Sequence, residues 1–173
     1  MWLDADTALR HVDRLNAAAL ALCGNRPDAE DLVQETFMTL LRRPRRLTGG
    51  SELAYLMTML RNRHIDMHRS ASRRHVVALH ESEEPVDRRT GLRPDEVAEQ
   101  QEVFAAVHAL DSPFRETVVA VDVLGLSYKE AAKALDVPVG TVMSRLARGR
   151  KRLQALLAKH MGKEASIELS TNA

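Results

Sequence analysis

The sequence predicts an all-α fold, with two small helical domains joined by a flexible linker. Aromatic residues make up only 3% of the 173 residues, while alanine, leucine, valine and arginine abound, which favours helices over a β-sandwich. Apolar residues recur at helical spacing in two blocks, and the residues between the blocks show no apolar face. We therefore expect a first domain over residues 1–72, a linker over 73–93, a second domain over 94–161 and a disordered tail over 162–173.

Three helices are expected in the first domain, over residues 5–23, 27–41 and 51–71. Pro27 suits the first turn of the second helix, and Ser51 can cap the third. The side chains expected to form the core are Leu9, Val12, Leu15, Ala19, Leu22, Ala29, Leu32, Val33, Phe37, Leu40, Leu53, Leu56, Met57, Leu60 and Met67.

Two further helices should open the second domain, over residues 94–110 and 113–124. Asp111 is expected to cap the second of them, with Pro113 in its first turn. The core side chains expected from the first are Val97, Val103, Phe104, Val107 and Leu110.

A helix-turn-helix motif is expected next. Ser127 and Glu130 have the spacing of a capping box, so a short helix should begin there. Pro138 should end that helix, and Gly140 should ease the turn into a second one. The buried seam expected in the second helix is Leu146, Leu153 and Leu157.

The second helix of this motif is strongly basic, and no acidic residue interrupts it before Glu164. Its cations are Arg145, Arg148, Arg150, Lys151 and Arg152. A basic helix in this position is the part of a helix-turn-helix that enters the major groove of DNA. The alternative is an ordinary helical hairpin with a solvated arginine face, and the lack of compensating acids counts against it.

The helix over residues 27–41 also has a polar, acidic stripe beside its core face. Asp31, Gln34, Glu35 and Met38 follow one another at the spacing of a single helix face. A solvated surface is the simpler interpretation, and residue types alone favour it. The alternative is a docking face for a basic partner, with Met38 as an adaptable apolar contact.

Four arginines surround Pro44, and a glycine-containing loop leads from them into the third helix, whose second half is basic. Such a helix, with Tyr55 and Asn62 on its mixed face, could bind single-stranded nucleic acid through backbone cations and contacts to unstacked bases. A solubilising arginine loop is the alternative, and one aromatic residue does not establish base binding.

Charge and cysteine content narrow the classes of function. The net charge is only +1, but acidic and basic patches are kept apart, which indicates one basic and one anionic partner. Cys23 is the single cysteine, so no internal disulfide or thiolate metal cluster can form, and it should be a small buried apolar residue. No signal peptide or membrane-spanning segment is recognisable, so we expect a cytoplasmic protein without metal or cofactor.

Three motifs resemble the bacterial RNA polymerase sigma factors of the extracytoplasmic-function (ECF, group 4) sigma-70 family. The sequence DAEDLVQETF at 28–37 is similar to region 2.2, and LRNRHID at 60–66 is similar to regions 2.3–2.4. GLSYKEAA at 125–132, followed by PVGTVMSRL at 138–146, resembles region 4.2. The motifs occur in the family's order, and a short linker in place of a third domain fits the ECF group.

The resemblance implies partners for the faces described above. The polymerase core would dock its β′ clamp helices on Asp31, Gln34, Glu35 and Met38, and its β flap on the second domain. The melted −10 promoter element would be held by Thr48, Gly49, Ser51, Tyr55, Arg61, Asn62, Arg63 and Arg69. The −35 element would be contacted by Thr141, Met143, Ser144, Arg145, Arg148 and Lys151. An anti-sigma factor is a further candidate partner, and the free chain is expected to be a monomer.

The chain departs from the family pattern in four places. Tyr55 stands where tryptophan is usual, and Met143 where lysine or arginine is common. Gly149 replaces a usual alanine within the recognition helix, at a cost of about 1 kcal/mol in helix propensity. The helix before Gly24 is shorter than usual.

The function expected from the sequence is that of a promoter-specificity factor, not an enzyme. Two alternatives remain open: a helix-turn-helix regulator that binds duplex DNA alone, and a sigma mimic that titrates an anti-sigma factor. Asn62 and the basic run from Arg145 to Arg152 count against the mimic, which need not keep DNA-binding residues.

Overall fold

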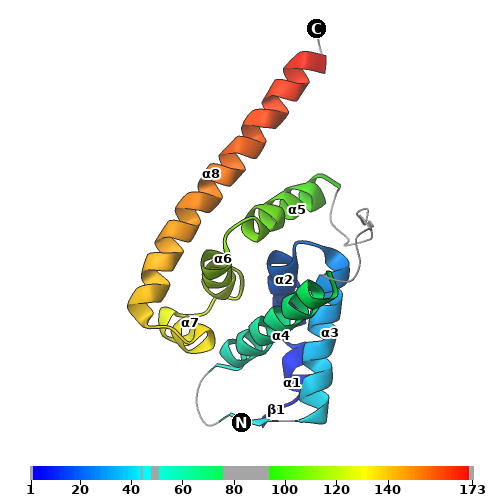
Figure 1. The fold of residues 1–173 in the computed structure, drawn as a ribbon, viewed down its shortest axis with the longest axis vertical. Coiled ribbons are helices and arrows are strands. Elements are labelled where there is room, and N and C mark those ends of the chain that lie inside the picture. The colour runs from blue at the N-terminus through cyan, green and yellow to red at the C-terminus, as the bar shows by residue number, and fades with distance from the viewer. Residues whose placement is uncertain (1, 44, 48–50, 76–93, 172–173) are drawn as a thin grey trace.

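The computed structural model describes residues 2–43, 45–47, 51–75 and 94–171, and it confirms an all-α fold of two helical domains (Figure 1). The first domain comprises β1 (Trp2–Leu3), α1 (Ala5–Leu9), α2 (Val12–Cys23), α3 (Arg26–Arg42), β2 (Arg45–Arg46) and α4 (Glu52–His75). The second comprises α5 (Pro94–His108), α6 (Ser112–Val118), the π-helix η1 (Val119–Val123), α7 (Tyr128–Leu135) and α8 (Val139–Thr171). None of the described helices combines the length and apolar character needed to cross a membrane.

The core of the first domain lies between α2, α3 and α4. Helix α3 begins where Asn25 caps it, its side-chain oxygen accepting a hydrogen bond from the Asp28 amide at 2.9 Å. The predicted core faces of α3 and α4 are confirmed, since Leu32, Leu56 and Leu60 are fully buried. The buried α3 face fixes which of its sides remains exposed.

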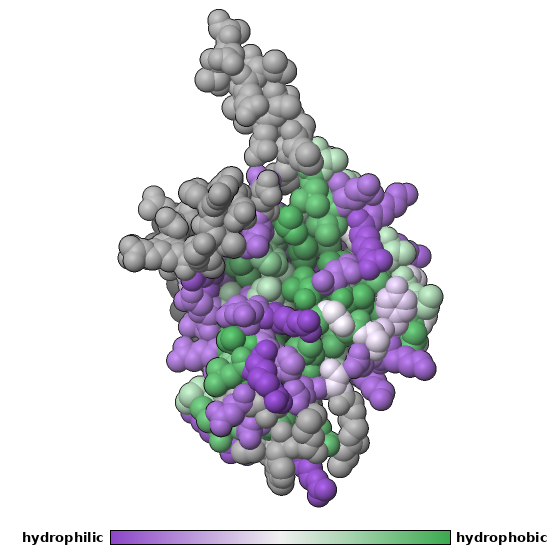
Figure 2. All heavy atoms as spheres, turned by 180° about the vertical axis from the view of Figure 1, so that it is seen from behind, coloured by the Kyte–Doolittle hydropathy of each residue, from purple (hydrophilic) through white to green (hydrophobic). Residues whose placement is uncertain are grey.

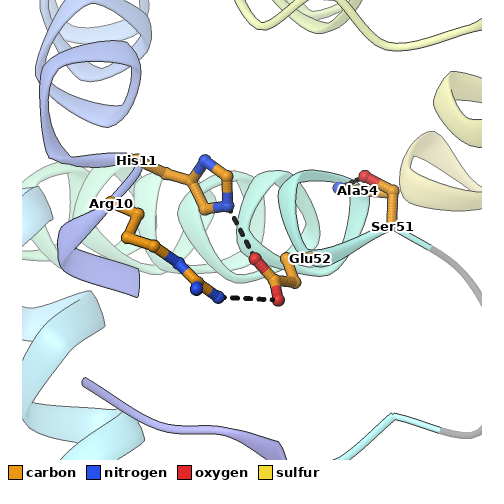
Figure 3. A network of polar contacts seen from close by, with 5 residues as sticks. All are labelled: Arg10, His11, Ser51, Glu52 and Ala54. Carbon is orange, nitrogen blue, oxygen red and sulfur yellow. Dashed lines mark hydrogen bonds and ion pairs between the residues drawn. The ribbon is translucent and has the colours of Figure 1, made fainter. Parts of the chain in front are cut away.

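The predicted single helix over residues 5–23 is wrong, because the chain turns between α1 and α2. The break directs two side chains at the start of α4: Arg10 Nη2 donates to Glu52 Oε1 at 3.3 Å, and His11 Nε2 lies 2.7 Å from Oε2 (Figure 3). Leu9, predicted in the core, is 53% exposed at this break. A contact with a residue more than 40 positions away therefore outweighs the local helical pattern.

A two-residue ribbon between β1 and β2 was not predicted either. The strands pair antiparallel, with Trp2 opposite Arg46 and Leu3 opposite Arg45. Leu3 is fully buried, so the ribbon closes the end of the first core and fixes the start of the arginine-rich loop. Segments this short carry no periodicity that a sequence could reveal.

In the second domain the capping box is confirmed. The Glu130 amide donates to Ser127 Oγ at 3.3 Å, and the Ser127 amide donates to Glu130 Oε2 at 2.9 Å. The turn after α7 depends on Asp136, which has the left-handed φ of 55°, whereas Gly140 lies in the first turn of α8 and was wrongly assigned that role. Aspartate tolerates this conformation better than most residues because its short side chain can bond locally.

Four other details differ from the sequence expectations. Asp111 precedes α6 but makes no capping bond, and pairs instead with Arg152. Val103 is 43% exposed and lies outside the core. The predicted linker begins inside α4, and residues 76–93 lie outside the described residues. The predicted disordered tail is helical through Thr171.

Gly149 is buried because α6 packs directly against α8 at that point. A Cβ added there would lie 3.0 Å from Val118 Cγ2 and 3.5 Å from Phe114 Cβ. The missing side chain therefore permits close helix packing, which offsets the helix propensity that was expected to be lost. Leu146 is buried in the same interface, whereas Leu153 and Leu157 are only half-buried, and apolar side chains remain exposed beside α8 (Figure 2).

The two domains pack against each other. Helix α4 contacts α7, and α2 contacts both α5 and η1. The carbonyl of Leu22, at the end of α2, accepts a hydrogen bond from Arg115 Nη1 at 3.0 Å, and His108 Nδ1 lies 2.9 Å from it. The second domain therefore lies close to the α4 surface that was predicted to bind DNA.

Candidate polymerase and nucleic-acid interfaces

The acidic stripe of α3 is accessible along its whole length. Asp31, Gln34 and Glu35 are exposed, and Met38 is 41% exposed. The opposite face is held in the core by Leu32 and its neighbours, so the stripe is a rigid surface. Such a surface suits a basic helix, with charge at one end and an adaptable methionine at the other.

On the basic face of α4, some side chains are exposed and others bind acidic side chains of the same chain. Asn62 and Arg69 are exposed, Tyr55 is half-buried against the core, and Thr48 and Gly49 lie outside the described residues. Arg63 pairs with Glu35 of the α3 stripe, although both side chains remain about half exposed to solvent. The DNA contacts predicted on this face are thus brought together with part of the predicted docking face.

Arg61 and Ser51 are both occupied by the second domain. Arg61 Nε donates to Glu116 Oε2 at 2.6 Å, with only 26% and 10% of the two side chains exposed. Ser51 Oγ accepts the Ala54 amide at 3.4 Å (Figure 3), and its hydroxyl also bonds to Glu130. Bonds from Ser127 and then Ser51 lower the pKa of the Glu130 carboxyl.

The five cations predicted on the second helix of the motif fall into two groups in α8. Arg150 pairs with Asp122, its Nη2 lying 2.6 Å from Oδ1, and Arg152 pairs with Asp111 while its guanidinium lies 4.2 Å from the Phe114 ring centre. These two arginines hold α8 against its own domain. Arg145, Arg148 and Lys151 have no ion pair among the described residues, so they are the cations available to a ligand.

The polar residues predicted beside these cations lie on the first turns of α8. Met143 is 53% exposed, and Ser144 is exposed while its hydroxyl donates to the Thr141 carbonyl at 3.1 Å. Thr141 is half-buried. The predicted −35 residues therefore lie on one helix, α8, which follows the turn at Asp136 that ends α7.

The sequence did not reveal a polar cluster around buried His64. Buried His64 lies with its Nε2 2.9 Å from that of His68, and Arg115 approaches from α6. Burial, followed by the nearby His68 and Arg115, lowers the pKa of His64 to about 4. Burial also lowers the pKa of His108, and Arg115 adds to this effect. The one available signal was the presence of two charged residues, Arg115 and Glu116, directly before the apolar run from Val118 to Val121.

Acidification is expected to weaken the fold through His64. The unfolded chain takes up this proton near pH 6.5, but the folded chain does so only near pH 4, so stability falls as the pH drops through that window. Lowering the pH from about 7.5 to 5.5 should reduce the free energy of unfolding by about 1 kcal/mol. Urea denaturation at both pH values measures this, and His64→Gln should show a smaller difference. An equal pH effect in the variant would exclude His64 as its source.

Comparison with known proteins gives two family matches. Residues 8–74 match Sigma-70 region 2, and residues 100–153 match Sigma-70, region 4. The first match covers the described part of the first domain from Ala8 to Arg74, and the second extends from α5 into α8. Both predicted DNA-contacting helices therefore fall within matched segments.

Individual relatives agree with these family matches. The ECF RNA polymerase sigma factor SigE of Mycolicibacterium smegmatis is 36% identical over 160 residues, which are 90% of this chain and 62% of that protein. EcfG of Rhodopseudomonas palustris is 36% identical over 155 residues, which are 88% of this chain and 83% of that protein. The chain thus spans less than two thirds of the length of SigE and most of EcfG.

Solved structures show a similar arrangement. The sigma factor RpoE of Bartonella quintana, crystallised with the anti-sigma factor NepR, has a TM-score of 0.69 at 28% identity, covering 88% of this chain and 95% of that one. CnrH, in complex with the cytosolic domain of CnrY, has a TM-score of 0.63 at 25% identity, covering 89% and 86%. With the two family matches and the EcfG similarity, these results show that the chain belongs to the ECF sigma factors of the sigma-70 family.

Proposed function

We propose that this chain is a promoter-specificity factor, which binds core RNA polymerase and directs it to −10 and −35 promoter elements. The observation that carries the proposal is the division of cations on α8. Arg150 and Arg152 are held by acids of their own domain, whereas Arg145, Arg148 and Lys151 remain available beside a capped turn. This arrangement suits major-groove binding by the second helix of a helix-turn-helix.

The other two interfaces follow from exposure and charge. The α3 stripe of Asp31, Gln34, Glu35 and Met38 supplies an acidic surface for the β′ clamp helices of the polymerase. Exposed Asn62 supplies hydrogen-bonding groups for an unstacked base, and the arginines around it supply contacts to the DNA backbone. Holding single-stranded bases in this way favours the melted state of the promoter.

The chain itself needs no chemistry in this role, because the polymerase catalyses transcription. We place the protein in the cytoplasm, where the polymerase acts, with domains close to 1–72 and 94–161 and no cofactor. The complexes formed by RpoE with NepR and by CnrH with CnrY support an anti-sigma factor as a further partner. The apolar side chains exposed beside α8 offer a surface for such a protein (Figure 2).

Transcription with purified core polymerase on a library of promoters tests the proposal. We expect transcripts that depend on both the chain and the promoter sequence. Tight duplex binding without any binding to core would support the stand-alone regulator instead. Core binding without a transcript from any promoter would support the sigma mimic.

Replacing Arg148 with alanine should relax the preference at one −35 base pair. Arg148 is exposed and unpaired among the described residues, so its guanidinium can bind a guanine edge in bidentate fashion, worth about 1–3 kcal/mol of discrimination. Transcription from −35 variants measures this preference. Lys151→Ala is the matched control and should reduce transcription from all −35 variants alike, as expected when a contact to a phosphate is lost. An equally uniform loss of transcription with Arg148→Ala would show that this residue, too, contacts the DNA backbone and not a base.

A further inference from the structure

The N-terminal segment, residues 2–11, contacts the chain on both sides of the connection between β2 and α4. Strand β1 pairs with β2 immediately before this connection. Arg10 and His11 bind Glu52, in the first turn of α4, immediately after it. One segment therefore holds both ends of a connection, residues 47–51, that was predicted to contact the −10 element.

The contact at Glu52 is enclosed. Only 13% of the Glu52 side chain is exposed, and both of its oxygens have a partner. Oε2 lies 2.7 Å from His11 Nε2, and Arg10 Nη2 donates to Oε1 at 3.3 Å (Figure 3). A carboxylate in such a place is costly to leave unpaired, so these two donors determine where the first turn of α4 lies.

The two donors come from a corner that has its own fixed backbone. The His11 amide donates to the Ala8 carbonyl at 2.9 Å, and the Leu15 amide donates to the His11 carbonyl at 2.9 Å. Ala8 and Leu15 are fully buried, and so is Leu3 of β1. The N-terminal segment is thus part of the core of the first domain, which makes it a rigid support for the start of α4.

Residues predicted to contact the −10 element lie on either side of Glu52. Ser51 precedes it, and the Ser51 carbonyl accepts a hydrogen bond from the Tyr55 amide at 3.2 Å, so all three residues share one turn. A site that distinguishes one ligand from another needs its side chains held to within about 0.5 Å. A shift of the first turn of α4 would therefore displace Ser51 and Tyr55 together.

We propose that Arg10 and His11 act through Glu52 as positioning residues for the −10 surface, and that they sharpen its preference for one base over the others. The N-terminal segment thereby contributes to promoter specificity, although it carries none of the residues predicted to contact DNA. The inference rests on the proposed function, since that function assigns Ser51 and Tyr55 to the −10 element.

Replacing His11 with leucine tests the proposal. Leucine keeps an apolar side chain of similar size but removes the donor, which leaves Glu52 Oε2 without its partner. Transcription with core polymerase from promoters that differ at single −10 bases should show the preference for the best base reduced by about tenfold. The preference among −35 variants and the affinity for core should not change. His11→Gln, which restores a donor of similar reach, should keep the wild-type −10 preference.

Asn25→Ala is the matched control for a general loss of stability. It removes the side-chain cap of α3 in the same domain, and it should leave the −10 preference unchanged. An equal −10 preference in His11→Leu and the wild type would overturn the proposal. An equal loss of preference in Asn25→Ala would overturn it as well, because the effect would then follow from destabilisation alone.

Arg10→Leu gives a second test, which also holds if His11→Leu does not fold. The Arg10 side chain is 66% exposed, so its replacement should leave the fold intact. The −10 preference should fall by about threefold, as expected for a partly exposed ion pair, whereas Arg14→Leu, at an exposed position one turn further on, should have no effect. A wild-type −10 preference in Arg10→Leu would contradict the positioning role. Absence of promoter-dependent transcription by the wild type would instead contradict the proposed function.

Discussion

Replacing Asp31 with arginine is expected to lower the affinity for core RNA polymerase by about 100-fold. Asp31 is exposed on the α3 stripe without an ion pair among the described residues, so the change should leave the fold intact. An arginine facing a basic partner introduces like-charge repulsion of several kcal/mol. A loss of about 2.7 kcal/mol in binding free energy is enough to lower the affinity 100-fold. Binding of a labelled chain to purified core measures the effect.

Asp13→Arg is the matched control for this variant. It makes the same charge change at an exposed position on α2, outside the stripe, and should bind core as the wild type does. Adding Glu35→Arg to Asp31→Arg should abolish core binding, although this variant also releases Arg63 from its ion pair. Unchanged affinity in the single variant would show that α3 is not the docking face.

Gly24→Ala is expected to reduce the free energy of unfolding by about 2–4 kcal/mol. Gly24 has a φ of 75°, which costs an L-residue about 1–2 kcal/mol. In addition, a Cβ would lie 2.4 Å from His108 Cδ2, so the ring must move away from its contact with the Leu22 carbonyl, at a cost typical of overpacking. Urea denaturation followed by circular dichroism measures the sum.

Gly125 offers a control that separates these two contributions. Its φ is 71°, but a Cβ there would meet no atom within 4 Å, so Gly125→Ala should cost only about 1–2 kcal/mol. The excess for Gly24→Ala then reports the contact between α2 and α5. Equal destabilisation by the two variants would indicate that the domains do not stay packed at this point in solution.

The helices whose ends carry local signals could be predicted from the sequence. The Ser127–Glu130 capping box and the Pro27 turn each place a helix start through bonds within a few residues, and the structure has α7 and α3 at those positions. The acidic stripe was also predictable, because it shares a helix with a clear core face. The assignment of these faces to polymerase and promoter came from the resemblance and stays a prediction residue by residue.

The features that the sequence did not reveal all depend on distant contacts. The break before α2 follows from Glu52, and the burial of Gly149 follows from Val118 on α6. Likewise, nothing in the sequence indicated that Arg61 has an intramolecular partner, because Glu116 lies 55 positions away in the other domain. Periodicity describes one helix at a time and carries no information on which helices meet.

The ion pairs that Arg150 and Arg152 of α8 form within their own domain also limit how strongly salt affects the binding of that helix to DNA. Binding to duplex DNA releases condensed counterions, and the logarithm of affinity falls by about 0.9 per neutralised phosphate for each tenfold rise in salt. With Arg150 and Arg152 held by Asp122 and Asp111, only Arg145, Arg148 and Lys151 among the cations named on α8 can displace ions. Among these five cations, Arg145, Arg148 and Lys151 are therefore the ones expected to contribute to the salt dependence of duplex binding.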